Sequence, residues 1–278
     1  MSKPRRDDGT AWVVLAALLC VGAIVVTAIA SEGGRAAIDA PIAMAFDWQA
    51  TLGLRQPWRL WTCAWVHWSG AHLAINLAGA SVVAFVGRRA RLPAAAAAAW
   101  ALAWPLTQVL MATLGGDRLA VLMPHYGGLS GVLHAGVIVL GLALAWPPAA
   151  ARSPAAPARV GTGFVATRAS AIEPSRITEG PWAMTEMGTA TVLPASTLEQ
   201  ASPTTAALSD DRPLRERWIG AAIVAGTLAK VLLEAPWQLA PRPSAALGIA
   251  VAPVAHACGL GAGLLAWVGW RLLARRAR

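Results

Sequence analysis

Apolar residues form six long runs along the chain, and polar or charged residues gather between the runs. A run of about 20 apolar residues is long enough to cross the hydrocarbon core of a bilayer as a helix. The pattern therefore predicts an all-α membrane protein, a bundle of six transmembrane helices. The six predicted spans lie at about residues 11–30, 70–87, 94–115, 128–146, 218–234 and 250–273.

The first apolar run predicts a membrane anchor, and the segment after it predicts an outer region that lies partly at the membrane interface. The run ends in Ala28-Ile29-Ala30, which is similar to a signal peptidase site. We expect an uncleaved anchor, because the run is longer than the core of a signal peptide. Residues 31–57 are mixed in polarity and predict an external loop. The four tryptophans from Trp58 to Trp68 predict a helical stretch at the membrane interface.

Residues 147–217 differ in composition from the rest of the chain, since they are rich in Ala, Pro, Ser and Thr and show no helical or strand period. Such a segment buries too little apolar surface to offset the entropy lost on ordering it. We therefore predict a disordered cytoplasmic linker. Residues 1–146 would then hold helices one to four, and residues 218–278 would hold helices five and six of the same core.

The placement of arginine predicts how the spans are oriented. The chain is 56% apolar and 13% charged, with a formal net charge of +9, but its arginines gather at the ends of the apolar runs instead of forming a basic face. This pattern argues against a nucleic-acid partner and indicates helix ends that stay in the cytoplasm. We expect both termini to be cytoplasmic, so that spans two, four and six begin at the outer face.

The outer ends of spans four and six carry a serine and a histidine suited to acyl transfer. A serine hydroxyl hardly ionises at neutral pH and needs a base, and His256 fits that role for Ser130. Gly259 and Gly263 form a GxxxG face on span six, a pattern that lets helix backbones approach closely. Gly131 gives span four a similarly slim face. The sequence therefore predicts a nucleophile and a base within hydrogen-bond reach of each other.

The same outer region supplies donors for the oxyanion of an acyl transfer. His72 and Asn76 are four residues apart, hence on one face of span two. The N–H groups where span four begins, around Gly128 and Leu129, lack partners within the helix. Donors of this kind stabilise the charge that develops on the carbonyl oxygen. We expect these four residues to bind substrate and stabilise the oxyanion.

Other polar residues of the spans have alternative interpretations. His134 lies one turn after Ser130 and is a rival base, or else a buried histidine with satisfied hydrogen bonds. Lys230 and Glu234 are four residues apart and are expected to pair with each other. His67, before span two, is expected to brace the loop. The three cysteines show no metal-ligand spacing, so we expect neither a metal nor a cofactor.

Three motifs together resemble those of the rhomboid intramembrane serine proteases. They are His67-x4-His72-x3-Asn76, Gly128-Leu129-Ser130-Gly131 and Ala255-His256-x2-Gly259-x3-Gly263. The resemblance implies a six-helix rhomboid-like bundle with Ser130 and His256 as its catalytic dyad. It also implies that His72 and Asn76 stabilise the oxyanion and that His67 is a structural loop residue.

A narrower resemblance is to the rhombosortase branch. Its cues are Trp58-Arg59-Leu60-Trp61-Thr62, Tyr126-Gly127-Gly128-Leu129-Ser130-Gly131-Val132-Leu133-His134 and Ala229-Lys230-Val231-Leu232-Leu233-Glu234. The resemblance implies a bacterial inner-membrane enzyme whose substrates carry a carboxy-terminal Gly-Gly motif and a membrane tail. Two features depart from it: Pro253, where span six begins, and the long linker of residues 147–217.

The sequence thus predicts an intramembrane serine endopeptidase that cleaves membrane-anchored proteins near the outer membrane face. Its expected partners are those substrates and the lipid bilayer. The alternatives are a catalytically inactive relative that binds membrane tails and a transporter lined by histidines.

Overall fold

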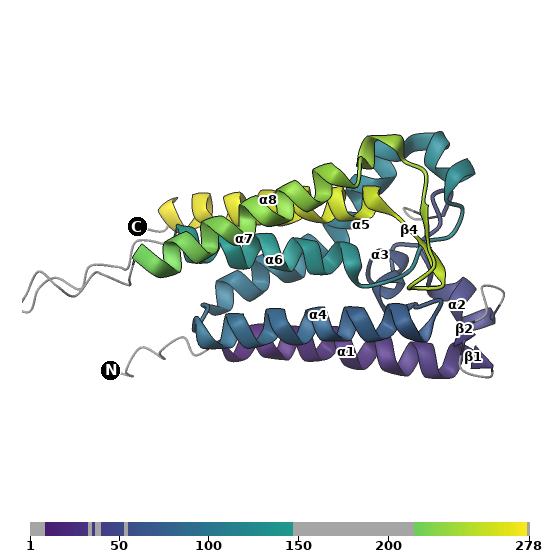
Figure 1. The fold of residues 1–278 in the computed structure, drawn as a ribbon, viewed down its shortest axis with the longest axis horizontal. Coiled ribbons are helices and arrows are strands. Elements are labelled where there is room, and N and C mark those ends of the chain that lie inside the picture. Colours follow the sequence, from purple (N-terminus) through teal and green to yellow (C-terminus); the bar gives the residue numbers. More distant parts are fainter. Residues whose placement is uncertain (1–8, 33–34, 37–39, 53–54, 147–213, 277–278) are drawn as a thin grey trace, which may run out of the picture. The chain divides into compact units, whose positions relative to one another are not determined.

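The computed structural model describes residues 9–32, 35–36, 40–52, 55–146 and 214–276. Its regular structure is mostly helical (Figure 1). The long helices are α1 (Thr10–Ala30), α4 (Gly70–Arg89), α5 (Ala94–Leu122), α6 (Ser130–Ala145), α7 (Leu214–Leu233) and α8 (Pro253–Arg276). Short helical segments are α2 (Pro41–Phe46), α3 (Arg59–Thr62), η1 (Cys63–Trp65) and η4 (Pro236–Gln238). Two small antiparallel hairpins are β1 (Ser31–Glu32) with β2 (Arg35–Ala36), and β3 (Arg242–Ser244) with β4 (Ile249–Val251).

Five helices of the described chain, α1, α4, α5, α7 and α8, are long and apolar enough to cross a membrane. The prediction of a mostly helical membrane protein is therefore confirmed at this level. The remaining apolar helix, α6, has 16 residues, or about 24 Å at 1.5 Å per residue. It is shorter than predicted because Gly128 has a φ of 129°, which no right-handed helix contains, so α6 begins at Ser130.

Helix α6 is the most enclosed of the long helices. It packs against α4, α5, α7 and α8 (Figure 1), and almost all of its residues after Ser130 are buried. The outward faces of its neighbours instead expose large apolar side chains, such as Val82, Leu102 and Leu265. Apolar side chains on the outer surface are typical of a helix bundle surrounded by lipid, since lipid tails solvate apolar side chains.

Several predicted boundaries shift by a few residues. Helix α7 begins at Leu214, so the last four residues assigned to the linker are helical, while residues 147–213 lie outside the described residues. Helix α8 begins at Pro253, and proline suits a first helical position because the N–H that it lacks would be unpaired there. Helix α5 continues past the predicted end of span three, but its backbone breaks at Gly116, which has φ 49° and ψ −150°.

Small residues bring α6 and α8 into backbone contact. A Cβ added at Gly259 would lie 2.0 Å from the carbonyl oxygen of Gly131, and one at Gly263 would lie 2.6 Å from that of Ala135. Only glycine fits at such distances. The predicted role of the GxxxG face is therefore confirmed: it allows α8 to lie directly against α6.

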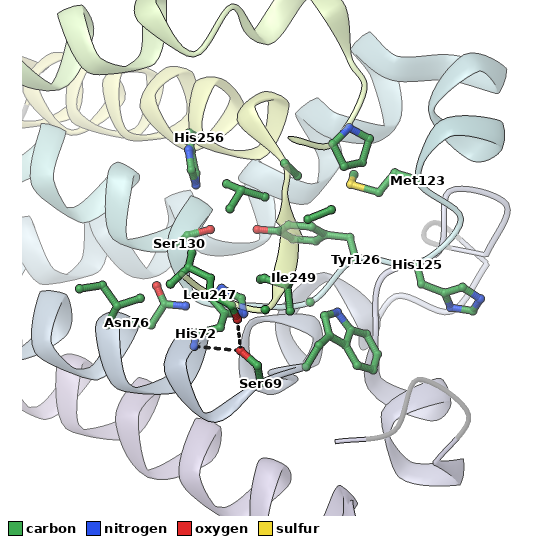
Figure 2. A pocket seen from close by; sticks show the side chains of 18 of the residues that line it. Ser69, His72, Asn76, Met123, His125, Tyr126, Ser130, Leu247, Ile249 and His256 are labelled. Atoms are coloured by element: carbon green, nitrogen blue, oxygen red, sulfur yellow. Dashed lines mark hydrogen bonds between the residues drawn. The ribbon is translucent and has the colours of Figure 1, made fainter. Parts of the chain in front are cut away.

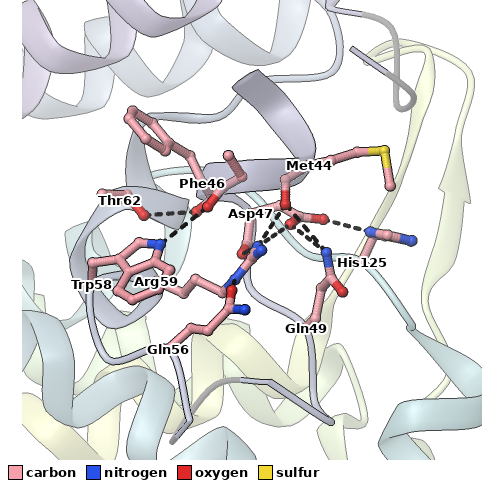
Figure 3. A network of polar contacts seen from close by, with 10 residues as sticks. Met44, Phe46, Asp47, Gln49, Gln56, Trp58, Arg59, Thr62 and His125 are labelled. Atoms are coloured by element: carbon pink, nitrogen blue, oxygen red, sulfur yellow. Dashed lines mark hydrogen bonds and ion pairs between the residues drawn. The ribbon is translucent and has the colours of Figure 1, made fainter. Parts of the chain in front are cut away.

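A buried polar network fixes the segments that precede the site (Figure 3). Arg59 donates a hydrogen bond to Asp47 Oδ1 at 2.7 Å, and His125 Nδ1 lies 2.5 Å from Asp47 Oδ2. The backbones of Trp48 and Tyr126 also form two hydrogen bonds, of 2.8 and 2.9 Å. The region predicted to be an external loop is thus tied to the segment that leads into α6.

Candidate functional site

A cavity of ≈ 980 Å³ opens where α4, α6 and α8 begin. The hairpin β3–β4, the end of α7 and residues 122–127 complete its walls (Figure 2). Seven of the residues selected from the sequence line this cavity: His72, Asn76, Ser130, His134, Lys230, Glu234 and His256. The prediction that these three helices bring polar groups together at one end of the bundle is therefore confirmed.

Ser130 is the first residue of α6 and is half-buried at the cavity wall. The turn before it is compact, because a Cβ at Gly128 would lie 2.5 Å from Cε1 of His72. Leu129, in contrast, has its side chain fully buried in the core. A glycine at position 128 thus lets the His72 ring lie directly against the backbone that carries the serine.

Tyr126 is a site residue that the sequence analysis did not select. Its ring is buried, its hydroxyl donates a hydrogen bond to the carbonyl oxygen of Gly128 at 3.5 Å, and burial raises the pKa of the phenol above its ordinary value. The phenol therefore stays neutral, and it lines the cavity together with Ser130. Its position four residues before Ser130 was the available signal.

His256 lies in the first turn of α8 and its ring is directed into the cavity above Ser130 (Figure 2). A Cβ at Gly131 would lie 2.9 Å from the carbonyl oxygen of Ala255, so the two backbones touch beside the serine and the histidine. His256 Nδ1 is 2.7 Å from Oε2 of Glu234. Its other ring nitrogen, Nε2, has no hydrogen-bond partner among the described residues.

The rival base, His134, has both ring nitrogens occupied. Nδ1 is 2.6 Å from the carbonyl oxygen of Ser130, and Nε2 is 3.2 Å from Nζ of Lys230. A carbonyl oxygen only accepts and an ammonium only donates, so His134 is the neutral tautomer with its proton on Nδ1. It has no free lone pair for the serine proton. The structure favours the interpretation of His134 as a buried, satisfied histidine, stacked on His256 with ring centroids 4.2 Å apart.

The predicted pair of Lys230 and Glu234 is confirmed, with Nζ and Oε1 2.6 Å apart. Both residues also make contacts that the spacing did not predict. Glu234 is hydrogen-bonded to His256 on α8, and Lys230 is hydrogen-bonded to His134 on α6. The four side chains form one connected polar group along the cavity wall.

His67 braces the loop as predicted. Its Nδ1 is 3.3 Å from the carbonyl oxygen of Trp65, and its Nε2 is 3.1 Å from Nδ2 of Asn76. Burial lowers the pKa of His67 to about 3, so the ring is neutral and accepts the amide hydrogen. One donor of Asn76 is therefore used by His67.

His72 is anchored at its backbone, where its N–H donates to Oγ of Ser69 at 3.1 Å. Its buried Nδ1 has no hydrogen-bond partner among the described residues. The ring lines the cavity beside the first turn of α6, whose N–H groups lack partners within the helix. The N–H of Gly128, in contrast, donates to the carbonyl oxygen of Cys63 at 2.9 Å.

No protein-family model, no curated protein and no solved structure matches the chain.

Proposed function

We propose that the protein is an intramembrane serine endopeptidase of the rhomboid type, which cleaves membrane-anchored proteins. The observation that carries the proposal is the meeting of Ser130 and His256 at one cavity, where the backbones of α6 and α8 touch. His256 Nε2 has no partner in the described part of the chain, whereas both ring nitrogens of His134 are occupied, and this difference supports His256 as the base.

The proposed reaction begins with attack by Ser130 Oγ on the carbonyl carbon of the substrate, while His256 Nε2 takes the hydroxyl proton. The oxyanion of the tetrahedral intermediate accepts hydrogen bonds from His72 and from the N–H groups at the start of α6, with the second N–H of Asn76 as a further donor. The C–N bond then breaks, and the departing amine takes the proton from His256. Water, or another amine, releases the acyl group from Ser130.

The proposed substrates are proteins with a carboxy-terminal membrane helix, and the resemblance to rhombosortases favours a Gly-Gly motif before that helix. Small residues at the cleaved bond suit a cavity that is lined by the apolar side chains of Leu247 and Ile249 in the β3–β4 hairpin region (Figure 2). The arginine pattern supports an inner-membrane orientation with cytoplasmic termini and a site at the outer face.

Cleavage of a tail-anchored reporter bearing a Gly-Gly motif tests the proposal. The purified protein in lipid nanodiscs is expected to release the soluble part of the reporter, and Ser130→Ala and His256→Ala are expected to abolish release. The matched control is Ser81→Ala, an exposed serine on α4 whose hydroxyl only bonds to the carbonyl of Leu77. Release by Ser130→Ala at the wild-type rate would refute the protease, and binding without cleavage by the wild type would favour a tail-binding protein.

A further inference from the structure

Glu234, at the end of α7, is held against the histidine of the proposed dyad although it comes from a third helix. We propose that Glu234 is a positioning residue that orients His256, so that the site works as a chain of Ser130, His256 and Glu234. This inference rests on the proposed function. It assigns to Glu234 a role beyond the ion pair with Lys230 that its spacing predicts.

The contact between Glu234 and His256 fixes which ring nitrogen carries the proton. Oε2 of Glu234 lies 2.7 Å from Nδ1 of His256, and a carboxylate can only accept a hydrogen bond. The proton of neutral His256 therefore sits on Nδ1, which leaves the lone pair of Nε2 for the serine proton. Once His256 takes that proton, the carboxylate also stabilises the imidazolium.

The carboxylate divides its two oxygens between two partners. Oε1 accepts from Lys230 at 2.6 Å, which leaves Oε2 for His256. The His256 side chain is 6% exposed and that of Glu234 is 26% exposed, so the histidine side of the contact is shielded from water. A Lys–Glu pair formed only to stabilise α7 would not need a second oxygen turned toward α8.

The surroundings of His256 leave Glu234 as its only anionic neighbour among the described residues that line the cavity. Helix α6 presents His134, whose ring stacks on His256 at 16° between planes, and α7 presents Lys230 beyond Glu234. Helix α4 presents His72 on the opposite wall. Stacking on His134 limits how far the plane of the His256 ring can tilt. The hydrogen bond to the Glu234 carboxylate sets how the ring is rotated within that plane.

Replacement of the carboxylate by its amide tests the inference. Glu234→Gln keeps size and shape but removes the obligatory acceptor, and an equivalent change in a Ser-His-Asp protease lowers kcat by about 10⁴-fold. We expect kcat for reporter cleavage to fall by at least about 100-fold with KM changed less than about threefold. We also expect the acid limb of the rate profile to move to lower pH, because an amide stabilises protonated His256 less than a carboxylate does.

The control is Glu216→Gln, the same change in the first turn of α7, which is expected to leave kcat and the pH profile unchanged. Wild-type kcat in Glu234→Gln, with Ser130→Ala inactive, overturns the inference and leaves the protease intact. A raised KM with an unmoved acid limb also overturns it, since that is the result of a structural role alone. Activity in Ser130→Ala overturns the proposed function itself.

A second measurement is made on the wild-type protein. ¹⁵N spectra of the wild-type protein, labelled at histidine and assigned by His256→Gln, report which ring nitrogen of His256 is protonated. A proton on Nδ1 is expected, and a neutral ring with its proton on Nε2 overturns the inference.

Discussion

Addition of a single methyl group at Gly259 should move the nucleophile, Ser130, away from the base, His256. In Gly259→Ala the new Cβ would lie 2.0 Å from the carbonyl oxygen of Gly131, whereas real Cβ contacts essentially never fall under 3.0 Å. The contact is between backbones, so no side-chain rotation relieves it. Helices α6 and α8 must therefore move apart by at least about 1 Å, directly beside Ser130 and one turn from His256.

The loss of activity caused by that movement follows from how strongly catalysis depends on the positions of the reacting groups. A misplacement of about 1 Å can reduce the rate by about 10²-fold, so we expect kcat of Gly259→Ala to fall by about 100-fold. Crowding of a packed core also destabilises by about 1–3 kcal/mol, which lowers the melting temperature without preventing folding. Reporter cleavage in nanodiscs gives kcat, and thermal unfolding followed by tryptophan fluorescence gives the stability.

The matched control lies on the same helix. A Cβ at Gly269 meets nothing within 4 Å, so Gly269→Ala is expected to keep both kcat and melting temperature near the wild-type values. Wild-type kcat in Gly259→Ala would refute the argument that backbone contact between α6 and α8 sets the distance from serine to base. An equal loss in Gly269→Ala would show that any alanine in α8 disturbs the bundle.

Three further predictions concern the residues around the site. Asp47→Asn leaves the buried Arg59 without its carboxylate and should cost about 3–5 kcal/mol of unfolding free energy, measured by denaturation in detergent; a loss under about 1 kcal/mol would contradict a structural ion pair. His67 has a folded pKa of about 3 against 6.5 in the unfolded chain, so the unfolded state binds the extra proton. Its contribution to stability is full above pH 6.5 and declines by up to about 1.4 kcal/mol per pH unit as the pH falls toward 3. Melting curves from pH 7 to pH 4 should show this decline in the wild type and a shallower one in His67→Gln; equal slopes would refute it. Gly128→Ala places a Cβ 2.5 Å from the His72 ring at a φ of 129°, so cleavage should fall by about tenfold or more, and unchanged cleavage would argue against an oxyanion role for His72.

The sequence predicted the helices and the gathering of polar groups because both depend on local rules. Apolar run length located most ends of the long helices within a few residues, and arginine placement predicted the alternating directions that would bring Ser130 and His256 to one end. The short α6 was not predicted, since apolarity continues through the turn before Ser130. Only the backbone conformation at Gly128 shows where the helix begins.

The side-chain contacts between different helices could not be predicted from the spacing of residues along the sequence. The spacing of Lys230 and Glu234 predicts their pair, but the bond from Glu234 to His256 depends on how α7 lies against α8. The choice between His134 and His256 as base likewise depends on which nitrogens are occupied, a property of three packed helices. The Asp47 network joins residues 12 and 78 positions apart, and no local pattern signals it.

The most direct test of the central claim is chemical identification of the nucleophile. The wild-type protein in nanodiscs is treated with a fluorophosphonate, which modifies activated serines, and the site of the adduct is mapped by mass spectrometry. The account predicts one adduct, on Ser130, formed at least about 100-fold more slowly in His256→Ala. An unmodified Ser130, or labelling that does not depend on His256, would contradict it.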